Sequence, residues 1–283
     1  MKYLITGATG NVGSLVTERL VALGERPCVF VRDPDKARSR FGDRVDIRTG
    51  DLGDARSELL PAFSGMDALF LVNSGPNLDV RDREVAFAAR AAGVKRLVKL
   101  STLDVRTGVG TGPWHARGEA AVRESGIAFT FIQSAAFMLN ALYWAPSIKR
   151  EGVLRSSTGD GKIAFIHEND IADVVCRALT TRDHDRASLV ITGPEALSYA
   201  EMASTIGAAR GKPVRFEQIS DERARKSALA RGGDREYADA LVDIWRAIRE
   251  GRLATVCDGV ERVTGRRPIP FQRWVEQNAK AFR

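Results

Sequence analysis

The spacing of three glycines directly behind the first apolar run constrains the fold of this chain more than any other feature. The chain begins MKYLITGATGNVGSLVTERL, in which Gly7, Gly10 and Gly13 lie three residues apart. The run before Gly7 has the apolar character of a buried strand, and apolar residues recur at helical spacing along the segment that follows. A strand, a glycine turn and an amphipathic helix in this order are typical of a dinucleotide-binding βαβ unit.

Each glycine has a physical role in such a turn. Gly7 permits the tight turn, Gly10 lets the backbone approach a pyrophosphate, and Gly13 lets the helix pack closely on the sheet. The free N–H groups of the first helical turn, at the positive end of the helix dipole, then bind the phosphates. A purely structural strand-to-helix turn is the alternative, but the second strand that follows favours dinucleotide binding. We expect these residues at the phosphates: Gly7, Thr9, Gly10, Asn11, Val12 and Gly13.

Strand and helix signals alternate through the first half of the chain, and this alternation predicts the fold class. Six apolar segments have strand character, and short helical segments connect them. The strands are expected in KYLITG, PCVFVR, RVDIRTG, MDALFLVN, VKRLVKLS and IAFTFIQS. Strands joined by helical crossovers pair in parallel and are covered on both faces. The sequence therefore predicts an α/β fold with a Rossmann doubly wound parallel sheet.

After about residue 135 the alternation loosens and helical patterns dominate. No Pro/Ser-rich linker separates the two halves, so the second part is expected to be a lobe that grows out of the first. We expect a helix and then two short strands at 136–150, 163–166 and 188–191. The predicted division is a Rossmann domain over residues 1–134 and a small, mostly helical substrate lobe over 135–283, with some elements interleaved into the Rossmann core.

The end of the second strand distinguishes between two dinucleotides. An acidic residue there bonds the ribose 2′-hydroxyl of NAD, whereas an arginine accepts the 2′-phosphate of NADP. The sequence VFVRDPDKA places Arg32 first, and Asp33 directly before Pro34 has the pattern of a helix N-cap. Arg32, with Lys36 one turn into the helix, therefore favours NADP(H) over NAD(H). A solvated Arg32 is the alternative, and an Asp33 turned towards the ribose would reverse the preference.

Two later strand ends are expected at the remaining parts of the dinucleotide. Asp51 and Leu52 follow the third strand and are expected beside the adenine, although capping of the next helix competes for Asp51. Asn73 and Ser74 end the fourth strand and are expected near the nicotinamide ribose.

The composition restricts the kinds of molecule that the chain is expected to bind. The net charge of +7 suits a nucleic acid or a phosphorylated small molecule, but the basic residues are interleaved with acidic ones, as in RSRFGDRVDIRTGD. We expect a small molecule and no nucleic acid. No apolar run reaches the roughly 18 residues of a membrane span, so no membrane partner is expected. Three scattered cysteines, Cys28, Cys176 and Cys257, lack metal-ligand spacing, which predicts no metal site and a reducing, cytoplasmic location.

The motifs, taken in order, resemble the short-chain dehydrogenase/reductase superfamily in its extended and atypical branches. The chain is most similar to the NmrA-like group, which includes NAD(P)H-binding quinone-oxidoreductase-like proteins. The matching stretches run along nearly the whole chain: ITGATGNVG, VRDPDKA, GDLGD, VKRLVKLS, ESGIAFTFIQSAAFMLN, ENDIADVV, ITGPEALSYAEMA and VTGRRPIPFQRWV. The resemblance implies a Rossmann fold with a small substrate lobe and a cleft at the strand ends.

The usual catalytic pair of that superfamily, Tyr-x-x-x-Lys, is absent from this sequence. The corresponding stretch reads GPWHARGEAAV, with His115 and Glu119 at the matching spacing. His115 is a candidate proton donor, because an imidazole titrates near neutrality. Glu119 either orients His115 or faces solvent in an i,i+4 pair with Arg123. A pocket-lining or surface histidine without a chemical role is the alternative, and the NmrA-like pattern itself often carries this pair.

The fifth strand carries two further candidates on one face, Lys99 and Ser101. The resemblance implies a hydroxyl at Ser101 that bonds the substrate carbonyl, and a loop cap is the alternative. A lysine inside a buried strand needs a partner. For Lys99 that partner is either the cofactor or a carboxylate.

The segment QSAAFMLNALYW is expected to line the substrate pocket. Aromatic side chains with polar tips suit a flat apolar ligand such as a quinone or a polyketide, although the same residues at helical spacing also suit a core. The candidates are Phe137, Asn140, Tyr143 and Trp144, with His167 as a residue that closes the pocket or sits in a turn.

Two functions remain open. A monomeric or homodimeric NADPH-dependent reductase of a quinone, enone, imine or polyketide-like carbonyl needs only the cofactor, a pocket and a proton source. A non-catalytic NADP(H)-binding redox sensor of the NmrA type also fits the missing Tyr and Lys. Nucleotide-sugar epimerisation needs the missing tyrosine base and is disfavoured.

Overall fold

The computed structural model describes residues 1–230, 232 and 234–283, which form two compact units. The first unit is built from Met1–Thr102, Trp114–Ser134 and Glu168–Val190. The second is built from Leu103–Pro113, Ala135–His167 and Ile191–Arg283.

A seven-stranded sheet organises the first unit. Its strands are β1 (Tyr3–Thr6), β2 (Cys28–Val31), β3 (Asp46–Thr49), β4 (Ala68–Leu71), β5 (Arg96–Thr102), β6 (Ala128–Ser134) and β9 (Ala187–Ile191). Their order is β3-β2-β1-β4-β5-β6-β9, and every pair from β3 to β6 is parallel. This is the order of a Rossmann sheet, which confirms the predicted fold class.

The six predicted strands all form, and β9 is a seventh strand whose place in the sheet the sequence did not predict. A backbone hydrogen bond joins Arg186 N to Phe129 O at the start of the two strands, and another joins Ala135 N to Ile191 O at their end. Because residue numbers increase in the same direction along both strands, β9 runs parallel to β6.

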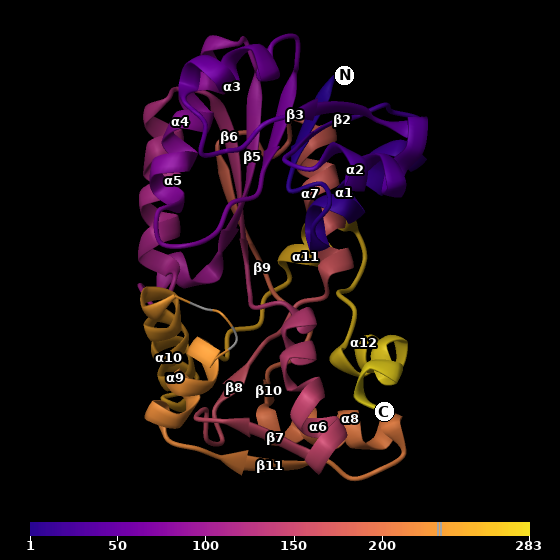
Figure 1. Ribbon diagram of the computed structural model, residues 1–283, viewed down its shortest axis with the longest axis vertical. Helices are drawn as coiled ribbons and strands as arrows, with labels where there is room; N and C mark the ends of the chain where they lie inside the picture. The colour runs from indigo at the N-terminus through magenta and orange to yellow at the C-terminus, as the bar shows by residue number, and fades with distance from the viewer. Residues whose placement is uncertain (231, 233) are drawn as a thin grey trace. The chain divides into compact units, whose positions relative to one another are not determined.

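Helices cover both faces of this sheet (Figure 1). They are α1 (Asn11–Ala22), α2 (Pro34–Phe41), α3 (Arg56–Phe63), α4 (Leu78–Ala91), α5 (Gly112–Glu124) and α7 (Glu168–Thr180), with the 3₁₀ helix η1 (Gly42–Arg44). Helices α1 and α7 lie on one face, where Arg19 Nε donates to Asp173 Oδ1 at 2.5 Å. Helices α3, α4 and α5 lie on the other, linked by pairs such as Arg83–Glu124. Alternate side chains of the strands fill the core beneath α3–α5, among them Leu69, Leu71 and Leu97.

The second unit has two small two-stranded sheets surrounded by helices. Strand β7 (Val153–Ser156) pairs in parallel with β11 (Arg215–Gln218), and β8 (Lys162–Ile163) pairs antiparallel with β10 (Leu197–Ser198). The helices are α6 (Ala145–Glu151), α8 (Tyr199–Arg210), α9 (Asp221–Ala230), α10 (Arg235–Arg249), α11 (Gly259–Thr264) and α12 (Phe271–Asn278), with 3₁₀ helices η2 (Leu103–Arg106), η3 (Met138–Trp144) and η4 (Ala279–Phe282).

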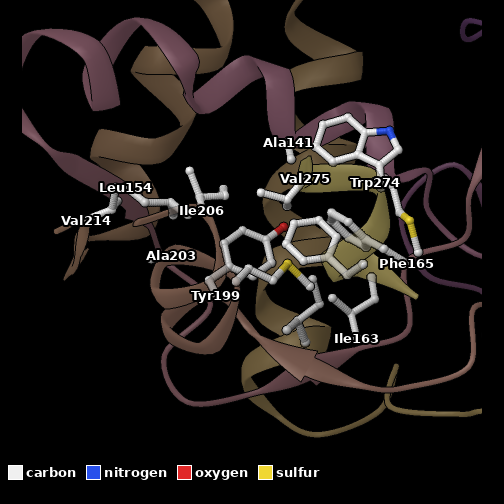
Figure 2. Close-up of a cluster of buried hydrophobic side chains, with 14 of the residues drawn as sticks. Ala141, Leu154, Ile163, Phe165, Tyr199, Ala203, Ile206, Val214, Trp274 and Val275 are labelled. Carbon is white, nitrogen blue, oxygen red and sulfur yellow. The ribbon is translucent and has the colours of Figure 1, made fainter. Parts of the chain in front are cut away.

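The helix expected over 136–150 is two helices instead. Residues Met138–Trp144 form the 3₁₀ helix η3, and α6 begins at Ala145 with Pro146 in its first turn. A proline fits a first helical turn but not a helix interior, so it marks a new start. An aromatic core holds this unit together (Figure 2), with Phe165 and Phe271 ring centroids 6.5 Å apart and Phe271 stacked on Trp274 at 5.8 Å.

Candidate functional site

The glycine turn between β1 and α1 has the shape of a phosphate cradle. Gly7 adopts a φ of +60°, a left-handed conformation that favours glycine, and Gly10 N donates to Gly7 O at 2.9 Å. Gly10 is the N-cap of α1 and its first turn contains no acidic residue. Gly7, Gly10 and Asn11 are exposed. The open N–H groups of this helix N-terminus suit a pyrophosphate.

Gly13 holds the helix against the turn itself. A Cβ built at Gly13 would lie 2.2 Å from Gly7 O and 2.6 Å from Gly7 C, closer than any real Cβ contact. At Gly10 it would lie 3.2 Å from the same oxygen. The absence of a side chain at position 13 therefore allows the close contact between the backbone of α1 and the turn. Thr9 is half-buried beside these residues, and Val12 is buried.

A cation lies at the end of β2, where a 2′-phosphate would be recognised. Asp33 caps α2, with its Oδ1 accepting from Lys36 N at 3.0 Å, as the sequence predicts. Arg32 is 81% exposed and lies 3.6 Å from Asp51 at the end of β3. Asp51 does not cap α3, whose N-cap is Ala55; its Oδ1 instead accepts from Gly53 N at 2.8 Å.

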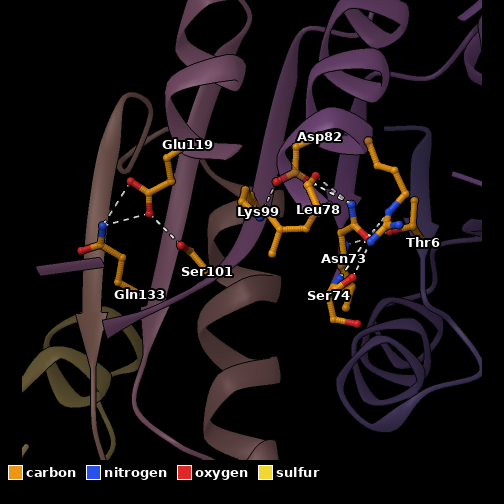
Figure 3. A network of polar contacts seen from close by, with 11 residues as sticks. Thr6, Asn73, Ser74, Leu78, Asp82, Lys99, Ser101, Glu119 and Gln133 are labelled. Carbon is orange, nitrogen blue, oxygen red and sulfur yellow. Dashed lines mark hydrogen bonds and ion pairs between the residues drawn. The ribbon is translucent and has the colours of Figure 1, made fainter. Parts of the chain in front are cut away.

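A buried ion pair lies between β5 and α4 (Figure 3). Lys99 Nζ is 2.7 Å from Asp82 Oδ2, and both side chains are 0% exposed. Of the two partners considered for Lys99, a carboxylate is the one present. Asn73 Nδ2 donates to Asp82 Oδ1 at 3.2 Å, and Asn73 Oδ1 accepts from Arg81 Nε at 2.9 Å. The side chain of Asn73 therefore fixes the β4–α4 connection. Its neighbour Ser74 is exposed.

A second buried network surrounds Glu119 on α5 (Figure 3). Ser101 Oγ donates to Glu119 Oε1 at 2.7 Å, and Gln133 Nε2 donates to the same oxygen at 2.9 Å. The pair with Arg123 forms at 3.2 Å, but the Glu119 side chain is only 2% exposed, so the solvent-facing alternative is wrong. Because the Ser101 proton is donated to Glu119, the hydroxyl has no proton to donate to a substrate carbonyl in this arrangement.

The imidazole of His115 does not titrate near neutrality. Burial, together with the positive charge of Lys99, lowers the pKa of His115 to about 3, and its Nδ1 is buried without a hydrogen-bond partner among the described residues. Desolvation disfavours the imidazolium, which speaks against proton exchange at His115 near pH 7. Any donor role would fall to the neutral ring. A catalytic role for His115 or Ser101 stays a prediction.

The second unit contains a cavity of about 550 Å³. Three of the expected pocket residues, Asn140, Tyr143 and Trp144, line it. Phe137 does not: its backbone forms a bridge to Ile166. His167 is also outside the lining; it is buried, with Nε2 3.2 Å from Gln277 Oε1.

Sequence reasoning missed two features. Asp82 shares an apolar helix face with Leu78, Val85 and Ala89, and a carboxylate at that spacing signals a buried partner. The second is the arginine group in the cavity lining, Arg150, Arg155 and Arg223. Strand and helix signals did not place these arginines together, because β7 and α9 are distant in sequence.

Metal-ligating groups, membrane-spanning helices and cysteines can be assessed in the part of the chain that the structure describes. It contains no group of His, Cys, Asp and Glu side chains that could hold a metal ion. None of its helices is long and apolar enough to cross a membrane. The three cysteines are free thiols, and burial raises the pKa of Cys28 to about 11 and that of Cys176 to about 12.

Comparison with known proteins agrees with this geometry. A family described as NAD(P)H-binding matches residues 7–182. A (4-alkanoyl-5-oxo-2,5-dihydrofuran-3-yl)methyl phosphate reductase of Streptomyces griseus is 37% identical, over 99% of this chain and 98% of its own. An NAD(P)H azoreductase of Xenophilus azovorans is 36% identical over the same shares. The crystal structure of quinone oxidoreductase QOR2 from Escherichia coli with NADPH superposes with a TM-score of 0.89, at 27% identity and with 98% of this chain and 99% of that one covered.

These matches extend over nearly the whole chain and confirm the resemblance to NmrA-like and quinone-oxidoreductase-like proteins. The glycine cradle, the Rossmann strand order and the relatives agree: the chain belongs to the NAD(P)H-binding family of oxidoreductases.

Proposed function

We propose that this protein is an NADPH-dependent reductase that transfers hydride to a small apolar acceptor, such as a quinone, an enone, an imine or a polyketide-like carbonyl. The observation that carries the proposal is the cradle of Gly7, Gly10 and Gly13 at the open N-terminus of α1. A side chain at position 13 would collide with the backbone of the turn at Gly7, so its absence lets α1 pack against the turn and keeps the N–H groups of its first turn beside the loop, as a diphosphate site requires.

The preference for NADPH over NADH rests on the end of β2. Arg32 and Lys36 are exposed there, and Asp33 is engaged as the cap of α2. A guanidinium binds a phosphate with two parallel charge-assisted bonds. Among the described residues, the ion pair to Asp51 at 3.6 Å competes for Arg32. The residues that would hold the rest of the cofactor are Asp51, Leu52, Asn73, Ser74, Lys99 and Ser101; Lys99 would act through Asp82 and Asn73 rather than by contact.

The acid–base groups favour acceptors that need little protonation. Bound NADPH supplies a hydride. The chain offers no Tyr-x-x-x-Lys, the pKa of His115 is about 3, and Ser101 donates its proton to Glu119. A quinone or an iminium accepts hydride without a strong proton donor, whereas a simple ketone relies on one.

The acceptor is assigned to the cavity of the second unit. Its aromatic wall includes Trp144, Phe165 and Tyr199, with the Trp144 and Tyr199 centroids 4.8 Å apart. Such a lining suits a flat apolar molecule. The relatives named above reduce a quinone, an azo compound and an unsaturated lactone phosphate, which are all conjugated acceptors. The three free thiols support a cytoplasmic location.

The test is steady-state reduction of a quinone panel, followed at the nicotinamide absorbance band with NADPH and with NADH. We expect turnover with NADPH, and a loss of about tenfold in kcat/KM for NADPH in Arg32→Gln, with NADH little changed. Arg38→Gln is the matched control, because Arg38 on α2 is also exposed and its ion pair is with Asp35 on the same helix. Equal losses in both variants would contradict the role of Arg32.

A redox sensor is the second candidate. Ser101 donates its proton to Glu119, and His115 is neutral near pH 7. Both observations favour the sensor, because neither side chain is an obvious proton donor. Tight NADPH binding without turnover across quinones, enones and imines would support the sensor and contradict the reductase.

A further inference from the structure

The cavity of the second unit has an unusual distribution of charge. Its lining contains three arginines, Arg150, Arg155 and Arg223, and no carboxylate among the residues that the structure describes. The rest of the wall is mostly apolar or aromatic. A concave, partly desolvated surface with charge of one sign focuses its field on the interior. The cavity is therefore built for a ligand that carries negative charge as well as apolar surface.

The nearby carboxylates stand outside the lining and neutralise its charge only in part. Glu151 lies 2.5 Å from Arg150 and 2.5 Å from Arg155. Glu217 lies 3.2 Å from Arg155, 3.6 Å from Arg223 and 3.9 Å from a fourth arginine, Arg215. The three guanidinium groups of the lining thus share two carboxylates, which leaves a net charge of +1 at the cavity, and Arg215 outside the lining also pairs with Glu217. Arg155, only 23% exposed, is the most firmly held of them.

A hydroxyl in the lining also has no partner. Three serines line the cavity. Ser147 Oγ donates to Trp144 O at 3.0 Å, and Ser227 Oγ donates to Arg223 O at 3.0 Å. Ser156 is only 4% exposed, and its Oγ has no hydrogen-bond partner among the described residues. A buried donor without an acceptor costs free energy, and a rotation of this side chain towards the cavity would let an oxyanion there accept from it.

The residues of α9 that line the cavity lie on one face of this helix, and Arg223 is one of them. Arg223, Ala224, Ser227 and Ala228 recur at intervals of three and four residues along α9, and all four line the cavity. The face of α10 that carries Leu241 contributes the apolar part. The cavity thus has an aromatic and aliphatic region and a cationic region.

We infer that this cavity binds a flat apolar molecule with an anionic oxygen-bearing substituent, a carboxylate, sulfonate or phosphate monoester. The ring system lies against Trp144 and Tyr199, and the anion lies at Arg155, Arg223 and Ser156. A guanidinium fork matches such oxyanions in geometry as well as in charge. That this ligand is also the hydride acceptor rests on the proposed reductase function.

The test compares matched probes by calorimetry on the full chain, with and without NADP⁺. The anions are naphthalene-2-sulfonate, 2-naphthyl phosphate and 2-naphthoate, and the neutral match is 2-(methylsulfonyl)naphthalene. We expect at least one anion to bind about tenfold more tightly than the sulfone, which is about 1.4 kcal/mol. The relative affinities of the three anions identify the preferred group.

Two variants with exposed arginines make the test specific. Arg223→Met is expected to remove about tenfold of the anion affinity and to leave the sulfone unchanged. Arg215→Met is the control, because Arg215 also pairs with Glu217 and is 70% exposed, against 60% for Arg223, but does not line the cavity. Ser156→Ala is expected to weaken the anion a few-fold. Circular dichroism of each variant shows that the fold is intact.

The outcomes separate this inference from the proposed function. If the sulfone binds as tightly as every anion, or if Arg223→Met and Arg215→Met behave alike, the anion site is wrong. This holds even where 1,4-naphthoquinone is reduced by NADPH. If the anions bind selectively but NADPH reduces neither 1,4-naphthoquinone, nor its 2-sulfonate, nor any other quinone, enone or imine of the panel, the anion site stands and the reductase proposal fails.

Discussion

The buried pair of Lys99 and Asp82 makes a sharp prediction about stability. Replacing Lys99 with Met removes the ammonium that lies 2.7 Å from Asp82 Oδ2 and leaves the carboxylate in a place with 0% exposure. Breaking such a pair on one side costs about 3–5 kcal/mol. For a domain of this size each kcal/mol lowers Tm by roughly 2–4 °C, so the expected loss is roughly 6–20 °C.

The control uses a lysine pair of the same length on the surface. Lys95 Nζ lies 2.8 Å from Asp67 Oδ1, but the Lys95 side chain is 63% exposed. Exposed pairs contribute about 0–1 kcal/mol, so Lys95→Met should shift Tm by a few degrees at most.

A double variant completes the cycle. In Lys99→Met with Asp82→Asn neither position carries a charge, and the amide oxygen still accepts from Asn73 Nδ2. We expect it to recover at least half of the lost stability. Urea unfolding, followed by circular dichroism, gives the free energies. If Lys99→Met is no less stable than Lys95→Met, or if the double variant is less stable than both single variants, the reasoning about this pair is refuted.

Three further predictions follow from other sites. Gly13→Ala would place a Cβ 2.2 Å from Gly7 O, so it should abolish NADPH binding in calorimetry while Ser14→Ala keeps it; binding by both would exclude the cradle. The folded pKa of His115, about 3, lies below its unfolded value of about 6.5, so the unfolded chain takes up the proton first and stability falls with pH below about 6.5, by up to about 1.4 kcal/mol per unit. His115→Gln should lose this part of the pH dependence in urea unfolding at pH 7.5 and 5.5, and an unchanged profile would speak against a buried neutral ring. Cys28 is buried with a pKa of about 11, so iodoacetamide should alkylate it only in denaturant, and rapid alkylation of the native chain would contradict that burial.

Local chemistry explains what could be predicted from the sequence. The glycine turn, the N-cap at Asp33 and the six strands depend on neighbours within a few residues, and the structure contains all of them. Period-2 alternation also placed Lys99 and Ser101 on one face of β5. That face meets α4 and α5, where Asp82 and Glu119 lie.

Contacts between distant segments could not be predicted. The pairing of β7 with β11 joins Val153 to Arg215, and no local signal specifies it. The partner of Ser101 is Glu119, 18 residues away, so its hydroxyl takes part in a buried network that the strand pattern alone did not indicate. The cationic region of the cavity depends on the same long-range packing, because Arg155 and Arg223 lie on different elements.

The central claim is that the turn at Gly7–Gly13 binds a diphosphate and that Arg32 selects the 2′-phosphorylated cofactor. Calorimetric titration of the purified chain with NADPH and with NADH tests it most directly. We expect NADPH to bind at least about tenfold more tightly, a difference of about 1.4 kcal/mol. Failure of both cofactors to bind would contradict the claim as a whole, and tighter binding of NADH would contradict the role of Arg32.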